Sequence, residues 1–430
     1  MSSIQQQIAS AWNVPDLKKR LYYVVWGLLI FVVGTHIPAP GMDQAYVDRF
    51  FQTGGGGLFD LLDVFGGGAL KRFSIFALGI MPYINASIMM QLLVAIYPQL
   101  KEIQQEGEMG QRIIGRYTRW LTVVLAFLQG TGLIMTIQQG SLLVGSGPFA
   151  QRLLHFIVLL ASVVAGTMFL MFLGDEITKH GIGNGVSLII TIGIINRIPL
   201  MLAQEFISVS KDQDRIFNLV VFAIFCVIIV AGVVYVQLAV RKIPIHYARR
   251  QVGRKIYGGQ STYLPIRVLQ AGVIPIIFAT SILLIPSTIS SFISNPTFQS
   301  LIAKFQQSFL YVAVEFVLII LFTFVYTAIT FNTEDISNNL KKNGGFIPGI
   351  RPGKPTFEFL DKVLHRVTFF GAFALAIISV LPYLVNQITG ITSFWLGGTS
   401  LLIVVGVALD TVQQLQAHLV MRHYTGFTKA

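Results

Sequence analysis

Two carboxyl groups within apolar stretches are the first residues of this chain that could perform chemistry. Glu315 lies within the apolar run 308–331, and Asp410 lies near the end of the apolar run 395–415. Ionisable side chains inside a membrane are costly, and those that occur often relay protons or ions. This pair would suit an ion-coupled secondary transporter of a small solute. Alternatively, the two carboxyls lie near opposite faces of the membrane, where water reaches each of them and where they form a poor relay.

A second acidic pair, Asp60 and Asp63, is spaced i, i+3 on a short helix-like block, Leu58–Phe65, which lies between Gly54–Gly57 and Gly66–Gly68. At about 1.5 Å per residue the block is roughly 12 Å long, too short for a hydrocarbon core of ~30 Å. It is either an amphipathic surface helix or a half-helix in an aqueous funnel, with its acidic face in water. Irregular backbone at membrane depth must be buried in protein or line a cavity, so the second alternative indicates a pore.

Catalytic motifs are absent from the sequence. It contains no H-E-x-x-H, no G-x-x-x-x-G-K-[ST] and no G-x-S-x-G pattern. The seven histidines are scattered without the spacing of metal ligands, and Cys226 is the only cysteine. We therefore expect no enzymatic activity, no cofactor and no metal site.

The elements that position these residues are apolar helices. Charged residues are 12% of the chain, where a soluble protein carries about 25%. Runs long enough to span a membrane recur about ten times, which predicts an all-α membrane protein. We expect two pseudo-symmetric halves of five helices, 1–205 and 206–430, around a central pore. The runs are 21–38, 73–97, 118–137, 152–174, 182–203, 216–240, 269–289, 308–331, 367–386 and 395–415.

The distribution of basic residues predicts the orientation of these spans. With both termini in the cytoplasm, the outer segments and adjoining helix ends hold few of the 31 Lys and Arg residues. This is the positive-inside pattern. The first span has no small-residue cleavage site of the A-x-A kind, so we expect it to be retained rather than removed as a signal peptide. The basic residues on the outer side are Arg49, Lys71, Arg72, Arg152, Arg197, Lys211, Arg215 and Lys304.

Two long inner segments, 241–267 and 332–366, carry most of the mass outside the membrane. The first contains basic residues and no acidic one, and the second contains GGFIPGIRPGKP, whose glycines and prolines place Arg351 at an exposed tip. Such charges can simply set the topology and contact anionic lipid. They can also form a docking surface for a cytosolic machine or for polyanionic ribosomal RNA. The length of the segments favours docking.

The helix that follows the glycine-flanked block carries Ile80 and Ile84 on one face, with Pro82 between them to bend it. Isoleucine pairs at this spacing usually pack in a core. Asn85, Ser87 and Gln91 add polar groups that lipid would penalise.

Several long stretches resemble the bacterial SecY family, whose members are the central subunit of the Sec protein-conducting channel. The resemblance covers nearly the whole chain in order, from VPDLKKR to the last span. It implies a channel that passes unfolded secretory proteins across the plasma membrane and releases transmembrane helices sideways into lipid. The stretches are FGGGALKRFSIFALGIMPYINASIMMQLL (65–93), GIGNGVSLII (181–190), AGVIPIIFATSIL (271–283), NNLKKNGGFIPGIRPG (338–353) and GGTSLLIVVGVALD (397–410).

The resemblance also implies a seal made of two parts. The glycine-flanked segment 57–72 matches the plug that closes the channel from outside. Its core residues are Gly57, Leu58, Phe59, Asp60, Leu61, Leu62, Asp63, Val64, Phe65, Gly66, Gly67 and Gly68. The constriction of the family, a ring of aliphatic side chains from five helices, matches Ile80, Ile84, Ile190, Ile277 and Ile403.

In the family the channel opens sideways between the second and third spans and the seventh and eighth, where a signal sequence binds. The lateral gate residues expected here are Asn85, Ser87, Thr280 and Ser281, and we expect Asn85 and Thr280 to hydrogen-bond across the closed gate. The basic loops match the docking surface for the motor ATPase SecA and the ribosome. The partner subunits SecE and SecG are implied as well. The docking residues expected are Arg249, Arg250, Arg254, Lys255 and Arg351.

Overall fold

The structure is a computed structural model that describes residues 14–42, 47, 51, 63–138, 149–209, 215–247, 250–252, 255–257, 261–270, 272–292, 296–389 and 398–426. Helices form most of the described chain. They are α2 (Pro15–Gly34), α5 (Met81–Ile96), α6 (Pro98–Gln105), α7 (Glu108–Gln138), α8 (Phe149–His180), α9 (Gly185–Val209), α10 (Arg215–Leu238), α11 (Ile274–Phe292), α12 (Pro296–Gln307), α13 (Phe309–Thr330), α14 (Thr333–Lys342), α15 (Lys354–Thr389) and α16 (Gly398–Gly426).

Each of the ten predicted spans overlies one of these helices. Within the described residues, α7, α8, α10, α13, α15 and α16 are long and apolar enough to cross a membrane, whereas α5, α9 and α11 carry shorter apolar segments. The predicted span 73–97 begins as a helix only at Met81. The chain from 66 to 80 instead forms turns, with left-handed backbone at Gly67, Gly68, Phe73 and Gly79. The expected helix start was therefore wrong by about two turns.

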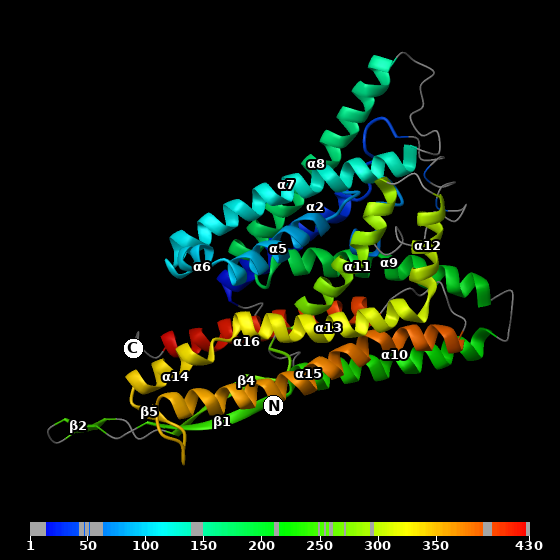
Figure 1. The fold of residues 1–430 in the computed structure, drawn as a ribbon. Coiled ribbons are helices and arrows are strands. Elements are labelled where there is room, and N and C mark those ends of the chain that lie inside the picture. The colour runs from blue at the N-terminus through cyan, green and yellow to red at the C-terminus, as the bar shows by residue number, and fades with distance from the viewer. Residues whose placement is uncertain are drawn as a thin grey trace.

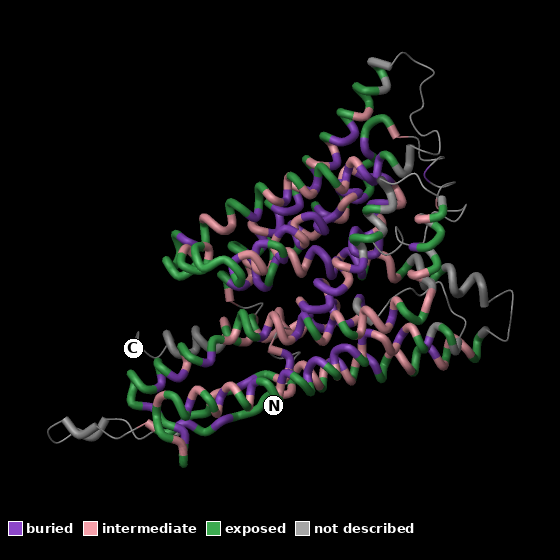
Figure 2. Tube along the Cα trace, viewed as in Figure 1, coloured by how far each residue is buried: buried purple, intermediate pink, exposed green. Residues whose placement is uncertain are grey.

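The helices form two groups with a buried layer between them. Figure 1 shows α2, α5, α7 and α8 in one group and α10, α13, α15 and α16 in the other, with α9 and α11 between the two. The buried residues in Figure 2 concentrate where α5, α9 and α11 meet. One large apolar cluster joins residues of both groups, including Phe31, Leu170, Ile276 and Leu375.

A small β structure at one end of the molecule was not expected from the sequence. β1 (Val240–Tyr247), β4 (Ser261–Arg267) and β5 (Gly345–Phe346) form an antiparallel sheet in the order β4-β1-β5, and β2 (Arg250–Val252) pairs with β3 (Lys255–Tyr257). Ile243 and Ile245 point into a small core together with Ile266 from β4. The alternation of buried isoleucines and exposed residues in β1 is the period-2 pattern of a strand with one covered face. It is the signal that would have revealed the sheet.

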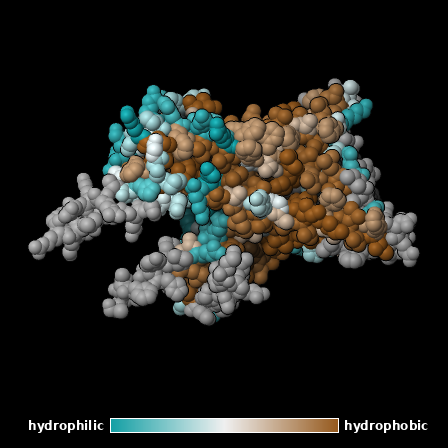
Figure 3. Space-filling view, turned by 90° about the horizontal axis from the view of Figure 1, so that it is seen from below, coloured by the Kyte–Doolittle hydropathy of each residue, from teal (hydrophilic) through white to brown (hydrophobic). Residues whose placement is uncertain are grey.

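The surface is divided between an apolar region and a polar end. In Figure 3 the hydrophilic residues gather toward the end that carries the strands, and hydrophobic residues cover much of the rest of that face. Large apolar side chains are widely exposed on the helices, among them Trp26, Trp120 and Phe370. Exposed apolar surface of this extent is typical of a protein that lies in lipid.

Candidate pore seal and lateral gate

The five predicted ring isoleucines converge on one cluster from different helices. Ile80, Ile84, Ile190 and Ile403 are buried members of the large apolar cluster, and Ile277 packs against it while partly exposed. They come from four helices rather than the five that the resemblance implies: Ile80 and Ile84 from the start of α5, and the others from α9, α11 and α16. Residues that are hundreds of positions apart in sequence therefore contribute to a single apolar cluster. Burial in a shared cluster is also what ordinary core packing of Ile80 and Ile84 would give, so their place in a pore ring stays a prediction.

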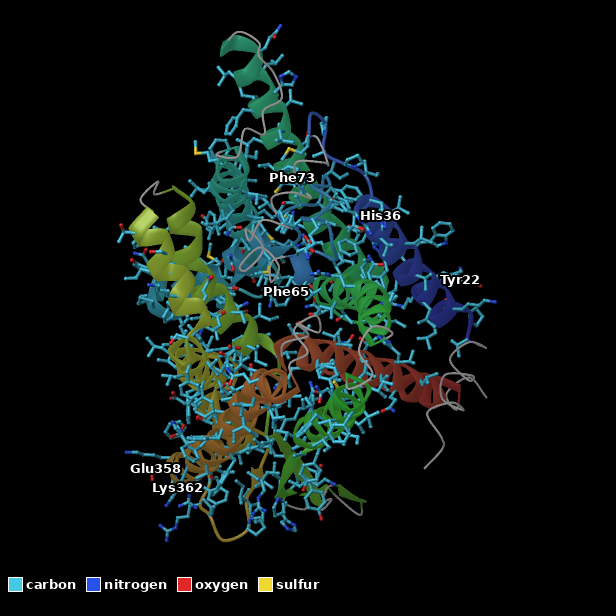
Figure 4. The ribbon with its side chains drawn as sticks, turned by 90° about the vertical axis from the view of Figure 1, so that its right-hand side faces the viewer. Tyr22, His36, Phe65, Phe73, Glu358 and Lys362 are labelled. Atoms are coloured by element: carbon cyan, nitrogen blue, oxygen red, sulfur yellow. The ribbon has the colours of Figure 1, made fainter. Side chains whose placement is uncertain are left out.

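Three buried residues of the plug segment join the same cluster, whereas Leu70 packs in a separate one. Val64, Phe65 and Ala69 are buried in the large apolar cluster together with the ring isoleucines. Figure 4, seen from the end opposite the strands, places Phe65 near the middle of the molecule and Glu358 and Lys362 at its edge. Residues 63–65 are helical and 66–72 form turns, while Gly57, Leu58, Phe59, Asp60, Leu61 and Leu62 lie outside the described residues.

We expected the acidic face of the short helix to lie in water, but Asp63 is buried, so this expectation was wrong for Asp63. Its side chain is 0% exposed, and its Oδ2 lies 3.1 Å from Nη1 of Arg197 on α9. Its Oδ1 accepts hydrogen bonds from the backbone N–H groups of Leu70 and Lys71, at 2.9 and 3.0 Å. The carboxylate therefore closes the turn 66–71 on itself and ties it to α9. A buried charge is tolerated because it is paired and hydrogen-bonded.

Two further residues of α9 hold the backbone of the plug segment. Asn196 donates from Nδ2 to the carbonyl oxygen of Gly67, at 3.3 Å. A Cβ at Gly193 would lie 3.1 Å from the Phe65 carbonyl oxygen and 3.2 Å from the Gly67 nitrogen, so a side chain there would push the two backbones apart by a few tenths of an ångström. We call these contacts with Gly193, Asn196 and Arg197 the plug dock.

The gate residues lie where α11 packs against α5, α7 and α13. The expected hydrogen bond between Asn85 and Thr280 does not form, because Thr280 Oγ1 donates to the carbonyls of Ile276 and Ile277 in its own helix. Ser87 likewise accepts from Gln91 of its own helix. Among the described residues, Asn85 Oδ1 and Ser281 Oγ are buried without a hydrogen-bond partner, as are Asp63 Oδ2 and Arg72 Nη1 of the plug segment and Gln237 Oε1 of α10. We call the packing of α5 and α7 against α11 the gate seam.

A cleft of about 410 Å³ lies beside the gate, at the end of the molecule that carries the strands. Val94 and Lys101, from α5 and α6, line one side of it. Thr327, Asp361 and His365, from α13 and α15, line the other. The cleft therefore separates the helices expected to part when the gate opens.

The two carboxyls considered for ion coupling lie in separate surroundings. Glu315 accepts a hydrogen bond from Ser379 Oγ of α15, at 3.1 Å. Asp410 lies 3.9 Å from Arg267, and both of these side chains are about half exposed. Within the part of the chain that the structure describes, no hydrogen bond or ion pair joins the two carboxyls.

Of the expected docking residues, Arg351 is exposed in the turn between β5 and α15, as predicted. Its carbonyl oxygen accepts from Thr356 Oγ1, which fixes that turn at the start of α15. Arg250 and Lys255 fall in β2 and β3, but their side chains lie outside the description, as do Arg249 and Arg254 altogether.

Arg197 is the functional candidate that the sequence reasoning missed. It was counted only as one of the basic residues at an outer helix end. Arg197 lies inside the apolar run 182–203, and a charged side chain in such a run requires a partner. This position in the sequence could have identified Arg197 as a candidate. No spacing rule identifies that partner as Asp63, far away in the sequence.

Comparison with known proteins gives consistent results. The sequence profile of the SecY family matches residues 74–412. The protein translocase subunit SecY of Thermotoga maritima is 43% identical over 431 residues, which cover 99% of this chain and 98% of that protein.

Solved structures share the fold at low sequence identity. One is a SecY protein whose plug domain stabilises the closed state of the translocation channel. It gives a TM-score of 0.63 at 17% identity, over 94% of this chain and 92% of that one. The other is Sec61 in a canine ribosome–channel complex from the endoplasmic reticulum. It gives a TM-score of 0.60 at 15% identity, over 94% and 93% of the two chains.

Proposed function

The chain belongs to the SecY family of protein translocase subunits, and we propose that its isoleucine ring and plug segment together seal the pathway for unfolded protein. The chain is a multi-pass membrane protein and a protein-conducting channel, not an enzyme. We assign the pathway to the interface between residues 1–205 and 206–430. The observation that carries this assignment is the joint burial of ring and plug residues in one cluster.

The chemistry of the ring suits a channel for many different sequences. Isoleucine side chains offer no hydrogen bond, so the ring does not select among passing residues. A narrow apolar constriction excludes water, and with it ions, when nothing fills it. The buried Val64 and Phe65 of the plug segment thicken this apolar seal on one side.

The gate seam is the proposed exit for apolar helices. The seam is formed by α5 and α7 against α11, and the cleft of about 410 Å³ extends between α5–α6 and α13–α15. A signal sequence is itself an apolar helix. It would enter from this cleft and lodge between α5 and α11, beside Asn85 and Ser281, with lipid completing its surface.

The proposed partners bind the end that carries the strands. We assign this end to the cytosol and the chain to the bacterial plasma membrane, with both termini cytoplasmic. Arg351 and the basic segment 241–267 would dock the motor ATPase SecA or the ribosome, and SecE and SecG would accompany the channel. The likeness to Sec61 in a ribosome complex supports a ribosome-docking role. Arg351→Glu should abolish SecA-driven translocation while the resting conductance stays at the wild-type value.

A conductance experiment tests the seal. Replacing three ring residues, as in I84G/I190G/I403G, should make the resting channel leak ions in a planar bilayer. Ile134 offers a matched control, because it is equally buried in α7 but belongs to a different apolar cluster. I190G should leak and I134G should not. An unchanged conductance in the triple variant would refute the proposed seal.

The ion-coupled transporter gains no support from these contacts. Glu315 and Asp410 contact Ser379 and Arg267, respectively, rather than a shared pathway. Replacing both carboxyls by amides should therefore leave protein translocation intact.

A further inference from the structure

We propose that Asp63 and Arg197 form an electrostatic latch that holds the plug closed and sets how strong a signal sequence must be to open it. The inference rests on the proposed function, because it presumes that residues 63–71 act as the plug. The inference assigns to Asp63 and Arg197 a role in determining how strong a signal sequence must be to open the channel.

The latch acts through an uncommon contact. The side chains of Asp63 and Arg197 are 0% and 12% exposed, and the charged atoms lie 3.1 Å apart. In so dry a place their attraction is poorly screened. Moving the plug away separates two opposite charges, so opening must overcome this attraction or supply water to both groups. Separating an apolar contact of the same area would involve no charges and no need to hydrate them.

The position of Arg197 couples the latch to the ring. Ile190, Gly193 and Arg197 are spaced i, i+3 and i+7, so they lie along one face of α9. That face carries, in order, a ring residue, the site of closest backbone approach to the plug, and the charge that binds Asp63. From Ile190 to Arg197 the helix rises about 10 Å. A substrate that displaces Ile190 and shifts α9 therefore also disturbs the ion pair.

Asp63 has a second task, which determines how the latch must be tested. Its Oδ1 accepts from the Leu70 and Lys71 N–H groups and so shapes the plug turn itself. Truncating Asp63 would lose both the ion pair and the turn. Asp63→Asn keeps an oxygen for the turn and places an uncharged amide beside Arg197. It therefore isolates the charge from the shape.

The experiment measures resting ion conductance, and the translocation of a precursor whose signal sequence has a shortened apolar core. D63N and R197Q should each raise the resting conductance by about tenfold or more, because either change leaves a buried charge without its partner. Both should also admit the weakened precursor. The double variant D63N/R197Q has no stranded charge and should leak less than either single variant. R197K, which keeps the positive charge, should stay close to wild type.

A second ion pair supplies the control. Arg119 Nη2 lies 2.9 Å from Asp175 Oδ2 between α7 and α8, with the two side chains 54% and 25% exposed. D175N and R119Q remove that pair without touching the plug and should change neither readout. Thermal unfolding in detergent verifies that every variant is folded.

Each outcome separates the latch from the proposed function. If I84G/I190G/I403G leaks but D63N and R197Q match the control pair, the latch is wrong and the seal stands. If the ring variant does not leak, the proposed seal itself fails. If the effect of the double variant equals the sum of the two single effects, the two side chains act independently, which also overturns the latch.

Discussion

The plug dock and the gate seam both have to open during transport, yet they are held together by different kinds of contact. In the plug dock the contacts are polar and charged: Asp63 pairs with Arg197 and accepts from two backbone N–H groups, and Gly67 accepts from Asn196. Asp63 Oδ2 has the charge of Arg197 beside it but, like Arg72 Nη1 of the plug segment, no hydrogen bond among the described residues. In the gate seam the packing is mainly apolar, and two buried oxygens, Asn85 Oδ1 and Ser281 Oγ, lack partners.

The difference indicates whether the plug dock or the gate seam contributes more to the free energy needed to open the channel. A buried polar atom without a partner costs about 1–3 kcal/mol, so the closed seam is less stable than its apolar packing alone would make it. An arriving helix, or water that enters with it, can satisfy Asn85 and Ser281. The dock also holds buried polar atoms that water could satisfy on opening, Asp63 Oδ2 and Arg72 Nη1, but its opening must separate a buried ion pair. Opening the seam separates no such pair, so we expect the dock to resist opening more strongly than the seam.

The largest expected effect breaks the dock through its backbone. Gly67 has a φ of +70°, and a Cβ there would lie 3.0 Å from the Gly193 Cα. Gly67→Val adds the left-handed penalty of roughly 1–2 kcal/mol to that steric conflict. We expect strong resting leakage, measured as bilayer conductance. Gly68 offers the control: it has a φ of +85° but open space around its Cβ, so Gly68→Ala adds strain without a clash and should leak less.

An intermediate effect of opposite sign is expected at the seam. Asn85→Leu replaces a residue whose buried oxygen has no partner and should stabilise the closed seam by about 1–3 kcal/mol. Insertion of a signal sequence should slow accordingly in a time-resolved crosslinking assay, while resting conductance stays low. Faster insertion would mean that Asn85 holds the gate closed, contrary to this account.

The smallest effect concerns one neutral hydrogen bond of the dock. Asn196→Ala removes the bond to the Gly67 carbonyl, with an expected cost of about 0.5–1.5 kcal/mol. Conductance should rise only a few-fold, well below the rise for D63N. A leak as large as that of D63N would place the strength of the dock in hydrogen bonding rather than in charge.

The sequence predicted the helices well, because long apolar runs permit few other structures. The resemblance assigns Ile80, Ile190 and Ile403 to a ring; they share one apolar cluster, and the ring itself stays a prediction. The sequence did not predict the contacts that distinguish dock from seam. The pairing of Asp63 with Arg197 depends on how α9 packs against a turn far away in the chain.

Local competition explains the failed pairing of Asn85 with Thr280. A threonine in a helix can donate to the carbonyl three or four residues before it, and Thr280 does so with Ile277 and Ile276. The strand signal in 240–267 is short: only Ile243 and Ile245 alternate as buried residues, and so brief an alternation among basic side chains is also compatible with a loop.

The central claim, that the polypeptide passes through the isoleucine ring, is tested most directly by site-specific photocrosslinking. A crosslinking residue at Ile84 is compared with one at Ile134, in the presence of an arrested secretory precursor. The account predicts crosslinks to the precursor from position 84 and none from position 134, which is buried in a separate cluster. Equal crosslinking at both positions, or none at position 84, would contradict it.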